Sequence, residues 1–118
     1  MSTFDHVDLM HNINANLAEF RKGQPAVTQS FGQMAQAAMT AGALDAKQKE
    51  LIALAIGVSQ RCSGCIGFHT KALRKLGATR QELEEVLSIC VYMGGGPSLM
   101  YAAEVISAWN QLDKPAQP

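Results

Sequence analysis

The sequence predicts an all-α fold, a bundle of about six helices that forms a single domain over residues 1–118. Apolar residues recur at steps of three and four along most of the chain, as they do on the buried face of a helix. No segment alternates apolar and polar residues in the way a half-buried strand does. Helix-start signatures and glycine stops divide the chain at short intervals, which indicates short connections.

The first two predicted helices carry one apolar stripe each. The first covers residues 4–22 and ends near Gly23, and the second begins at Pro25, whose missing N–H costs nothing in a first helical turn. We expect the first stripe to pack inside the protein. Ala and Met dominate the second and permit close, adaptable packing, so this helix is also a candidate subunit interface. The two stripes are Phe4, Val7, Ile13, Leu17 and Phe20, followed by Val27, Phe31, Met34, Ala35, Ala38 and Met39.

The third predicted helix begins at Asp45, which has Gln48 three residues later, the spacing of a capping box. Apolar residues from 51 to 58 cover most of its circumference, which is typical of a buried central helix. Glu50 is aligned with Leu54 and Gly57 on this helix, and an inward carboxylate is costly unless it is paired or protonated. Gly57 lowers helix propensity, so we expect a tightly packed neighbour on that face.

The fourth predicted helix begins at the cysteine pair. Cys62, Cys65 and His69 stand at i, i+3 and i+7, so all three project from one face. The rest of this inward stripe is Ile66, Ala72, Leu73 and Leu76, and Lys71, Arg74 and Lys75 take the opposite side.

Two further helices complete the predicted bundle. Gly77 ends the fourth helix, and Thr79 with Glu82 forms a second capping box. The glycines at 94–96 end the fifth helix, and Pro97 begins the last one. Their expected buried positions are Leu83, Val86, Leu87, Cys90 and Val91, then Leu99, Ala102, Ala103, Ile106 and Trp109.

Composition excludes several classes of function. Lys plus Arg and Asp plus Glu number 10 each, so the chain lacks the positive charge that binds nucleic acid. No apolar run approaches the roughly 18 residues that span a bilayer, so we expect no membrane partner. The first residues are acidic, unlike a secretory signal, which favours a cytoplasmic location. Apolar residues make up 47% and charged residues only 17%, which favours apolar surface buried between subunits.

The thiols and the imidazole suggest redox chemistry. Three cysteines, two of them close together, are too few for a disulfide framework. The free N–H groups at a helix start favour a thiolate, and the spacing lets Cys62 resolve an oxidised Cys65 as a disulfide. His69, one turn after Cys65, can accept its proton, and Glu50 from the neighbouring helix can orient the ring or take the proton onward.

Other interpretations of these residues stay open at this stage. Cys62, Cys65, His69 and Glu50 are also ligands of the types that zinc prefers, although three of them lie along one straight helix. A non-catalytic regulatory assembly with a redox-sensitive disulfide is a third possibility. Cys90 lies on an apolar stripe, so we expect it in the core. His6 and His11 lie about 140° apart around a helix and do not form a natural ligand pair, so we expect both at the surface.

The arrangement of Glu50, Cys62-x-x-Cys65-x-x-x-His69 and Leu76-Gly77-Ala78-Thr79 resembles the alkylhydroperoxidase D branch of the carboxymuconolactone decarboxylase family. The specific match runs from about Leu44 to Glu85. The resemblance implies an all-α fold assembled as trimers or hexamers, and a thiol-based hydroperoxidase without a metal or organic cofactor. It further implies that Cys65 is the peroxidatic thiol, Cys62 the resolving thiol, and His69 with Glu50 the proton relay.

The resemblance also implies partners for the reaction and shows one departure. A hydroperoxide would be the substrate, and a dithiol protein or a small thiol would reduce the disulfide. The best-known members place a second His immediately before the second Cys, where this chain has Gly64. The family's decarboxylases generally lack the cysteine pair, so its presence favours the redox branch.

Overall fold

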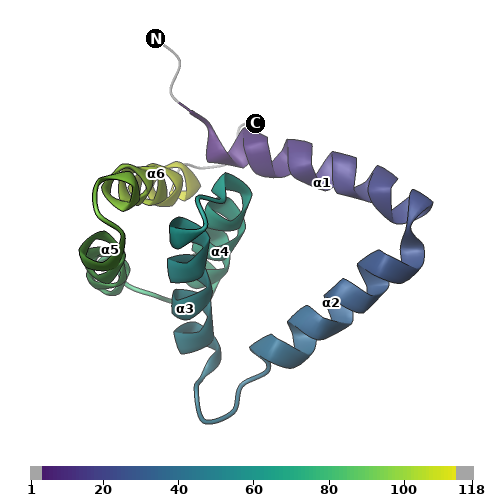
Figure 1. Ribbon diagram of the computed structural model, residues 1–118, viewed down its shortest axis with the longest axis horizontal. Helices are drawn as coiled ribbons and strands as arrows, with labels where there is room; N and C mark the ends of the chain where they lie inside the picture. The colour runs from purple at the N-terminus through teal and green to yellow at the C-terminus, as the bar shows by residue number, and fades with distance from the viewer. Residues whose placement is uncertain (1–3, 114–118) are drawn as a thin grey trace.

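The computed structural model describes residues 4–113, which fold into helices alone, as predicted (Figure 1). The six helices run in chain order: α1 (His6–Gly23), α2 (Pro25–Met39), α3 (Ala46–Ser59), α4 (Ser63–Lys75), α5 (Arg80–Gly94) and α6 (Gly96–Leu112). In the described residues no helix is both long and apolar enough to cross a membrane.

The helix ends follow the predicted capping signals. The capping boxes of Asp45 with Gln48 and of Thr79 with Glu82 both form, with the side chain and the backbone bonded in each direction. Gly77, just past the end of α4, has a φ of 78°, a conformation that glycine adopts at little cost. These local interactions fix where α3, α4 and α5 begin and end.

Helices α3 to α6 enclose the hydrophobic core. The core side chains come from all four helices and from the loop before α5: Leu54, Val58, Ile66, Leu73, Ala78, Leu83, Leu87, Cys90, Val105, Ala108 and Trp109. On the side of α4 that was predicted to be polar, the Arg74 guanidinium lies 4.3 Å from the centre of the Trp109 ring and covers it.

The exposed stripes of α3, α4 and α6 are broader than predicted. Ile52 and Ile56 of α3 are 48% and 56% exposed, because only the side of α3 that carries Leu54 and Val58 meets the core. Leu76 and Leu99, at helix ends, are also exposed. The prediction that α3 is buried on most of its circumference was therefore wrong.

Helix α1 packs on α4 and α6 by a face that only partly overlaps the predicted one. Its buried residues are His6 and Met10, whereas Phe4, Leu17 and Phe20 of the predicted stripe are exposed. His6 is only 1% exposed, so its predicted surface position was wrong, while His11 is exposed as expected. The inward face of α1 carries residues spaced at i, i+4 and i+7: His6, which lies against α6, and Met10 and Ile13, which lie against α4.

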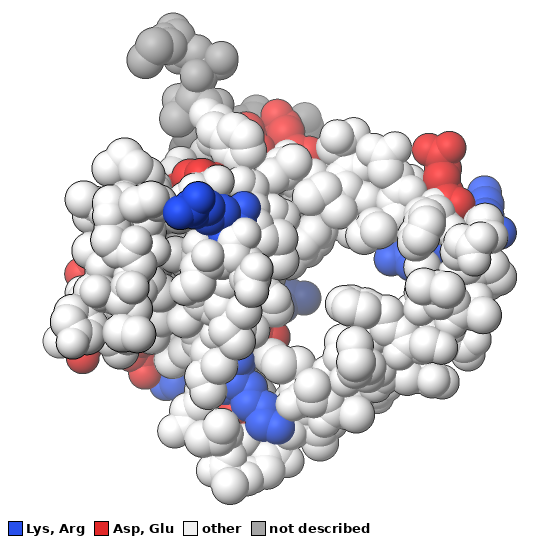
Figure 2. All heavy atoms as spheres, viewed as in Figure 1, with Lys and Arg blue, Asp and Glu red and all other residues white. Residues whose placement is uncertain are grey.

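Helix α2 leaves the bundle. It contacts only α1 and α3, and none of its residues is buried. Figure 1 shows α1 and α2 as two sides of an open triangle, and Figure 2 shows an opening between α2 and the bundle that is surrounded mostly by uncharged atoms. The α2 apolar face, defined here by Val27, Phe31 and Met34, is therefore exposed in the single chain, at 58%, 66% and 61%.

Candidate active site at the start of helix α4

A tight turn joins α3 to the cysteine pair. The Cys62 N–H donates to the carbonyl oxygen of Gly57 at 2.9 Å, and the Arg61 N–H donates to that of Val58 at 3.0 Å. Arg61 reverses the chain with a φ of 56°, which is uncommon for a side chain of this size. The turn therefore places the first cysteine directly over the last turn of α3.

Cys62 is the N-cap residue of α4. Its Sγ accepts a hydrogen bond from the Cys65 N–H at 3.2 Å. Cys62 and Cys65 form a disulfide with their Cα atoms 5.2 Å apart, well inside the usual range. Both residues are partly exposed, so an oxidant or a reductant can approach the pair.

The carboxylate of Glu50 lies against the ring of His69. Glu50 Oε2 is 2.6 Å from His69 Nδ1, and the two side chains are 16% and 31% exposed. The inward alignment of Glu50 seen in the sequence thus brings it to the imidazole on α4. Helix α3 can come this close to α4 because Gly57 has no side chain. A Cβ on Gly57 would lie 3.0 Å from Cys65 Cβ, which confirms the tightly packed neighbour expected there.

This contact fixes how His69 can act. A carboxylate only accepts hydrogen bonds, so Nδ1–H of the ring donates to Glu50. In a neutral imidazole Nε2 is then the nitrogen that accepts a proton. His69 stands one turn after Cys65 on the same side of α4, and its ring combines an acceptor nitrogen with an Nδ1–H that is held by Glu50.

Helix α1 covers the other side of the cysteine turn. A Cβ on Gly64 would lie 2.9 Å from Ile13 Cδ1, and one on Gly67 would lie 3.0 Å from Met10 Cγ. These two glycines, three residues apart, form the strip of α4 on which α1 rests. The position before Cys65 therefore faces an aliphatic side chain.

Two other expectations concern sulfur and metal. Cys90 is buried in the core as predicted, with its Sγ donating to the Ala55 carbonyl oxygen at 3.8 Å, and burial raises the pKa of its thiol. In residues 4–113, no group of three or more His, Cys, Asp or Glu side chains is arranged to hold a metal ion.

A sequence model of the carboxymuconolactone decarboxylase family matches residues 25–108, which is most of the chain. The chain belongs to this family. Its fold is similar to that of a carboxymuconolactone decarboxylase family protein from Legionella pneumophila, with a TM-score of 0.90 and 52% identity over 92% of this chain and 97% of that one. An uncharacterised protein of Cupriavidus necator is 38% identical over 94% of this chain and 98% of its own length.

A family protein from Thermotoga maritima is also similar, with a TM-score of 0.68 and 29% identity over 72% of this chain and 88% of that one. That protein has been suggested to take part in the antioxidative response. Family membership places the Cys62 to His69 segment and Glu50 inside the matched region.

One cluster of side chains beside the cysteine pair was not predicted from the sequence. Glu104 Oε1 of α6 accepts a hydrogen bond from Ser63 Oγ at 3.2 Å and lies 3.7 Å from Nε2 of the buried His6. The sequence feature that could have indicated part of this cluster is the spacing of His6, Met10 and Ile13, which places them on one face of α1. Nothing in the sequence placed α6 against the start of α4.

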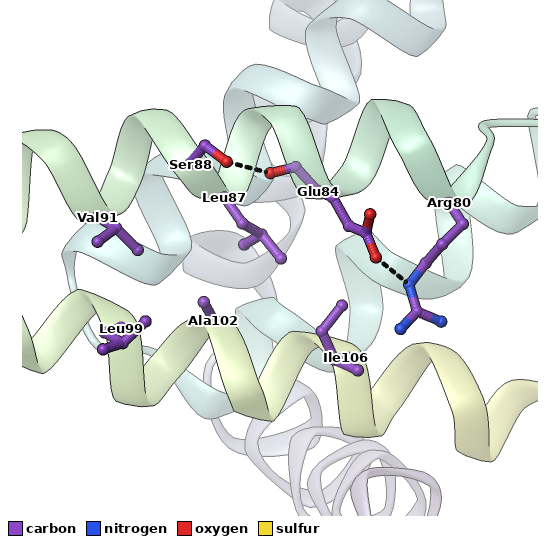
Figure 3. Close-up of a pocket in the computed structure, with 8 residues that line it drawn as sticks. All are labelled: Arg80, Glu84, Leu87, Ser88, Val91, Leu99, Ala102 and Ile106. Atoms are coloured by element: carbon purple, nitrogen blue, oxygen red, sulfur yellow. Dashed lines mark hydrogen bonds and ion pairs between the residues drawn. The ribbon is translucent and has the colours of Figure 1, made fainter.

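A separate groove of about 440 Å³ lies between α5 and α6 (Figure 3). Aliphatic side chains from the two helices face each other across it, and at one end the Arg80 guanidinium is bonded to Glu84. The Ser88 hydroxyl donates to the Glu84 carbonyl oxygen. Its lining contains neither a thiol nor an imidazole, unlike the site between α3 and α4.

Proposed function

We propose that the protein is a thiol-dependent peroxidase that reduces hydroperoxides and cycles through the Cys62 to Cys65 disulfide. The observation that carries the proposal is the 2.6 Å contact of Glu50 with His69, one turn after a cysteine that already pairs with a second thiol. Packing alone does not require a carboxylate, an imidazole and two thiols at one helix start, and burying such groups is costly.

In the first step Cys65 is the nucleophile. Its thiolate attacks the O–O bond of a hydroperoxide, so that one oxygen transfers to sulfur as a sulfenic acid and the other leaves as alcohol or water. His69 Nε2 takes the proton of the Cys65 thiol and returns it to the leaving oxygen, while Glu50 stabilises the imidazolium through Nδ1–H.

In the second step Cys62 resolves the sulfenic acid. Its sulfur attacks Cys65 Sγ, the S–S bond forms, and hydroxide leaves and takes up the proton of the Cys62 thiol to become water. The hydrogen bond from the Cys65 N–H to Cys62 Sγ favours a charged sulfur at this position. A dithiol protein or a small thiol then supplies two electrons and two protons to restore both thiols.

The test is the fate of the thiols. The reduced protein should lose two thiols for each peroxide consumed, with a Cys62 to Cys65 linkage found by mass spectrometry. Cys90→Ser serves as the matched control, because Cys90 is buried in the core, and it should consume peroxide at the wild-type rate. If Cys65→Ser consumes peroxide as fast as wild type, Cys65 is not the nucleophile.

A second candidate is a disulfide oxidoreductase, which exchanges the same disulfide with protein thiols and does not use peroxide. The observation that favours it is Gly64, which faces Ile13 where the best-known peroxidases of the family carry a His. Rapid exchange with a dithiol, together with peroxide consumption no faster than that of Cys65→Ser, would select this function. A redox-responsive regulator would show reversible oxidation and a change of assembly without turnover.

We further propose that the chain assembles with copies of itself through the α2 apolar face. A helix of 15 residues with no buried residue gains little from packing, and isolated helices of this length are marginal in water. The exposed Val27, Phe31 and Met34 supply the apolar area that a partner subunit would cover. This accords with the trimers or hexamers that the family resemblance implies.

A further inference from the structure

His6 is a buried imidazole that the proposed mechanism does not use. It is 1% exposed, and within residues 4–113 neither ring nitrogen has a hydrogen-bond partner. Its backbone N–H is held by Gln111 Oε1 at 2.7 Å, and the Phe4 ring meets its edge with centroids 4.7 Å apart. The ring is thus fixed in place while both of its nitrogens stay free, which is costly for a buried polar group without a role.

The nearest charged group connects this ring to the cysteine pair. Glu104 Oε1 lies 3.7 Å from His6 Nε2, and the same oxygen accepts a hydrogen bond from Ser63 Oγ at 3.2 Å. Ser63 is the first residue of α4 and stands between the two cysteines in the sequence. A chain of three side chains from α1, α6 and α4 therefore ends at the turn where the disulfide forms.

We propose that His6 and Glu104 form a second imidazole–carboxylate pair, which takes up a proton when the Cys62 to Cys65 disulfide is reduced and so supports the thiolate at the start of α4. In this role His6 and Glu104 are positioning residues for charge and do not touch the substrate. The inference rests on the dithiol and disulfide cycle of the proposed function, but it does not require peroxide to be the oxidant.

The charges account for the coupling. The disulfide is neutral, and Glu104 then carries a negative charge close to the start of α4. When the reduced pair ionises, a second negative charge appears near this carboxylate, and like charges repel strongly at a partly buried site. Proton uptake by His6 neutralises Glu104 and removes most of this repulsion.

The atoms balance in this step. A dithiol reductant breaks the S–S bond by supplying two electrons and two protons, and becomes a disulfide itself. One proton stays on Cys62, the second passes from Cys65 to His69 so that Cys65 is left as the thiolate, and His6 Nε2 takes up a further proton from the solvent. Because coupling is reciprocal, the thiolate favours protonated His6 as much as protonated His6 favours the thiolate.

The groups around the ring set the pKa of His6 in the disulfide form. The charged groups that face His6 are Glu104 from α6 and Asp5, the residue before α1, while α4 contributes the neutral hydroxyl of Ser63 to the cluster. Burial lowers the pKa of His6 and the two carboxylates oppose this shift. In the disulfide form the ring is therefore neutral near neutral pH, and an added negative charge nearby can raise its pKa.

The test is an NMR titration of the full-length protein with labelled histidine, in the disulfide form and after reduction by dithiothreitol. The His6 signal is identified by its loss in His6→Gln. The pKa of His6 should be higher in the dithiol form by about one unit, a tenfold change in proton affinity. An unchanged His6 pKa in the two forms of the wild-type protein overturns the inference.

Two controls keep the result specific. His11, exposed on the same helix, should titrate identically in both forms, and Cys62→Ser with Cys65→Ser should abolish the response of His6 to the reductant. Glu104→Gln should shrink the difference, and Ser63→Ala should weaken it if Glu104→Gln does not fold. No peroxide enters these measurements, so a failed peroxidase assay and a failed His6 shift are separate outcomes.

Discussion

Gly57 of α3 touches Cys65 of α4, and a Cβ added to Gly57 would lie 3.0 Å from Cys65 Cβ. This contact lies where α3 and α4 come together at the candidate site. Glu50 stands two turns before Gly57 on the same side of α3, so the separation of the helices at Gly57 governs how closely the carboxylate reaches His69. The missing side chain at Gly57 thus allows the Glu50 side chain of the same helix to form its hydrogen bond with His69 of α4.

We expect Gly57→Ala to destabilise the protein by about 1–2 kcal/mol, because overpacking against Cys65 Cβ outweighs the better helix propensity of alanine. Peroxide consumption should also slow, since a shift of α3 lengthens the contact of Glu50 with His69. Urea unfolding and initial rates of peroxide loss measure the two effects.

Gly32→Ala is the matched control for this substitution. Gly32 also lies inside a helix, but a Cβ there would meet nothing within 4 Å. Alanine should therefore leave stability unchanged or raise it by up to about 1 kcal/mol. Equal effects of the two substitutions would show that the packing at Gly57 is not tight in solution.

The parts of the site that the sequence predicted depend on local rules. Helix spacing put Glu50 and Gly57 on one face, and the capping boxes at Asp45 and Thr79 located the starts of α3 and α5. Helix propensity made Gly57 unusual enough to indicate close packing. Each of these signals acts within about two helical turns, so no long-range information was needed.

The parts that the sequence did not predict depend on which helices meet. The apolar periodicity of α1 and α2 is real, but Phe20 and Phe31 are exposed in the single chain, and α1 turns His6 and Met10 inward instead. Periodicity identifies an apolar face without saying what covers it. The link from Ser63 to Glu104 joins residues 41 positions apart and has no local signature.

Glu50→Gln should lower the rate of peroxide reduction about a hundredfold, at the lower end of the range for acid–base catalysis. The amide oxygen can still accept the hydrogen bond from His69 Nδ1, so the ring keeps its orientation, but the negative charge that stabilises imidazolium is lost. Stopped-flow peroxide consumption is the measurement. Glu85→Gln, at an exposed position of α5, should retain the wild-type rate, and an equal rate in Glu50→Gln would remove Glu50 from the relay.

Gly64→His should destabilise the protein, because the new side chain begins 2.9 Å from Ile13 Cδ1. Since that atom is the end of a flexible side chain, Ile13→Ala should relieve the clash and make the double variant more stable than the sum of the single changes predicts. We expect a coupling of about 1 kcal/mol in a double-mutant cycle of urea unfolding. Strict additivity would mean that Ile13 does not cover this position.

The disulfide form should lose stability as the pH falls, because burial lowers the pKa of His6 below its usual 6.5. At a pH between the pKa of folded His6 and that of unfolded His6, the unfolded chain binds a proton that the folded chain does not, so lowering the pH favours unfolding. Urea midpoints measured between about pH 7.5 and 5.5 test this expectation. His6→Gln should flatten the dependence, whereas His11→Gln, on the exposed side of α1, should leave it as in wild type.

The α2 apolar face gives a prediction about assembly. Phe31 is 66% exposed in the single chain, and a charge placed at the centre of an apolar interface is costly unless it is paired. Phe31→Glu should therefore convert the wild-type oligomer into smaller species at micromolar concentration, as seen by light scattering after size-exclusion chromatography. Gln81→Glu adds the same charge at an exposed position of α5 and should leave the mass unchanged. A monomeric wild-type protein under these conditions would contradict the proposed self-association, because α2 would then be stable without a partner.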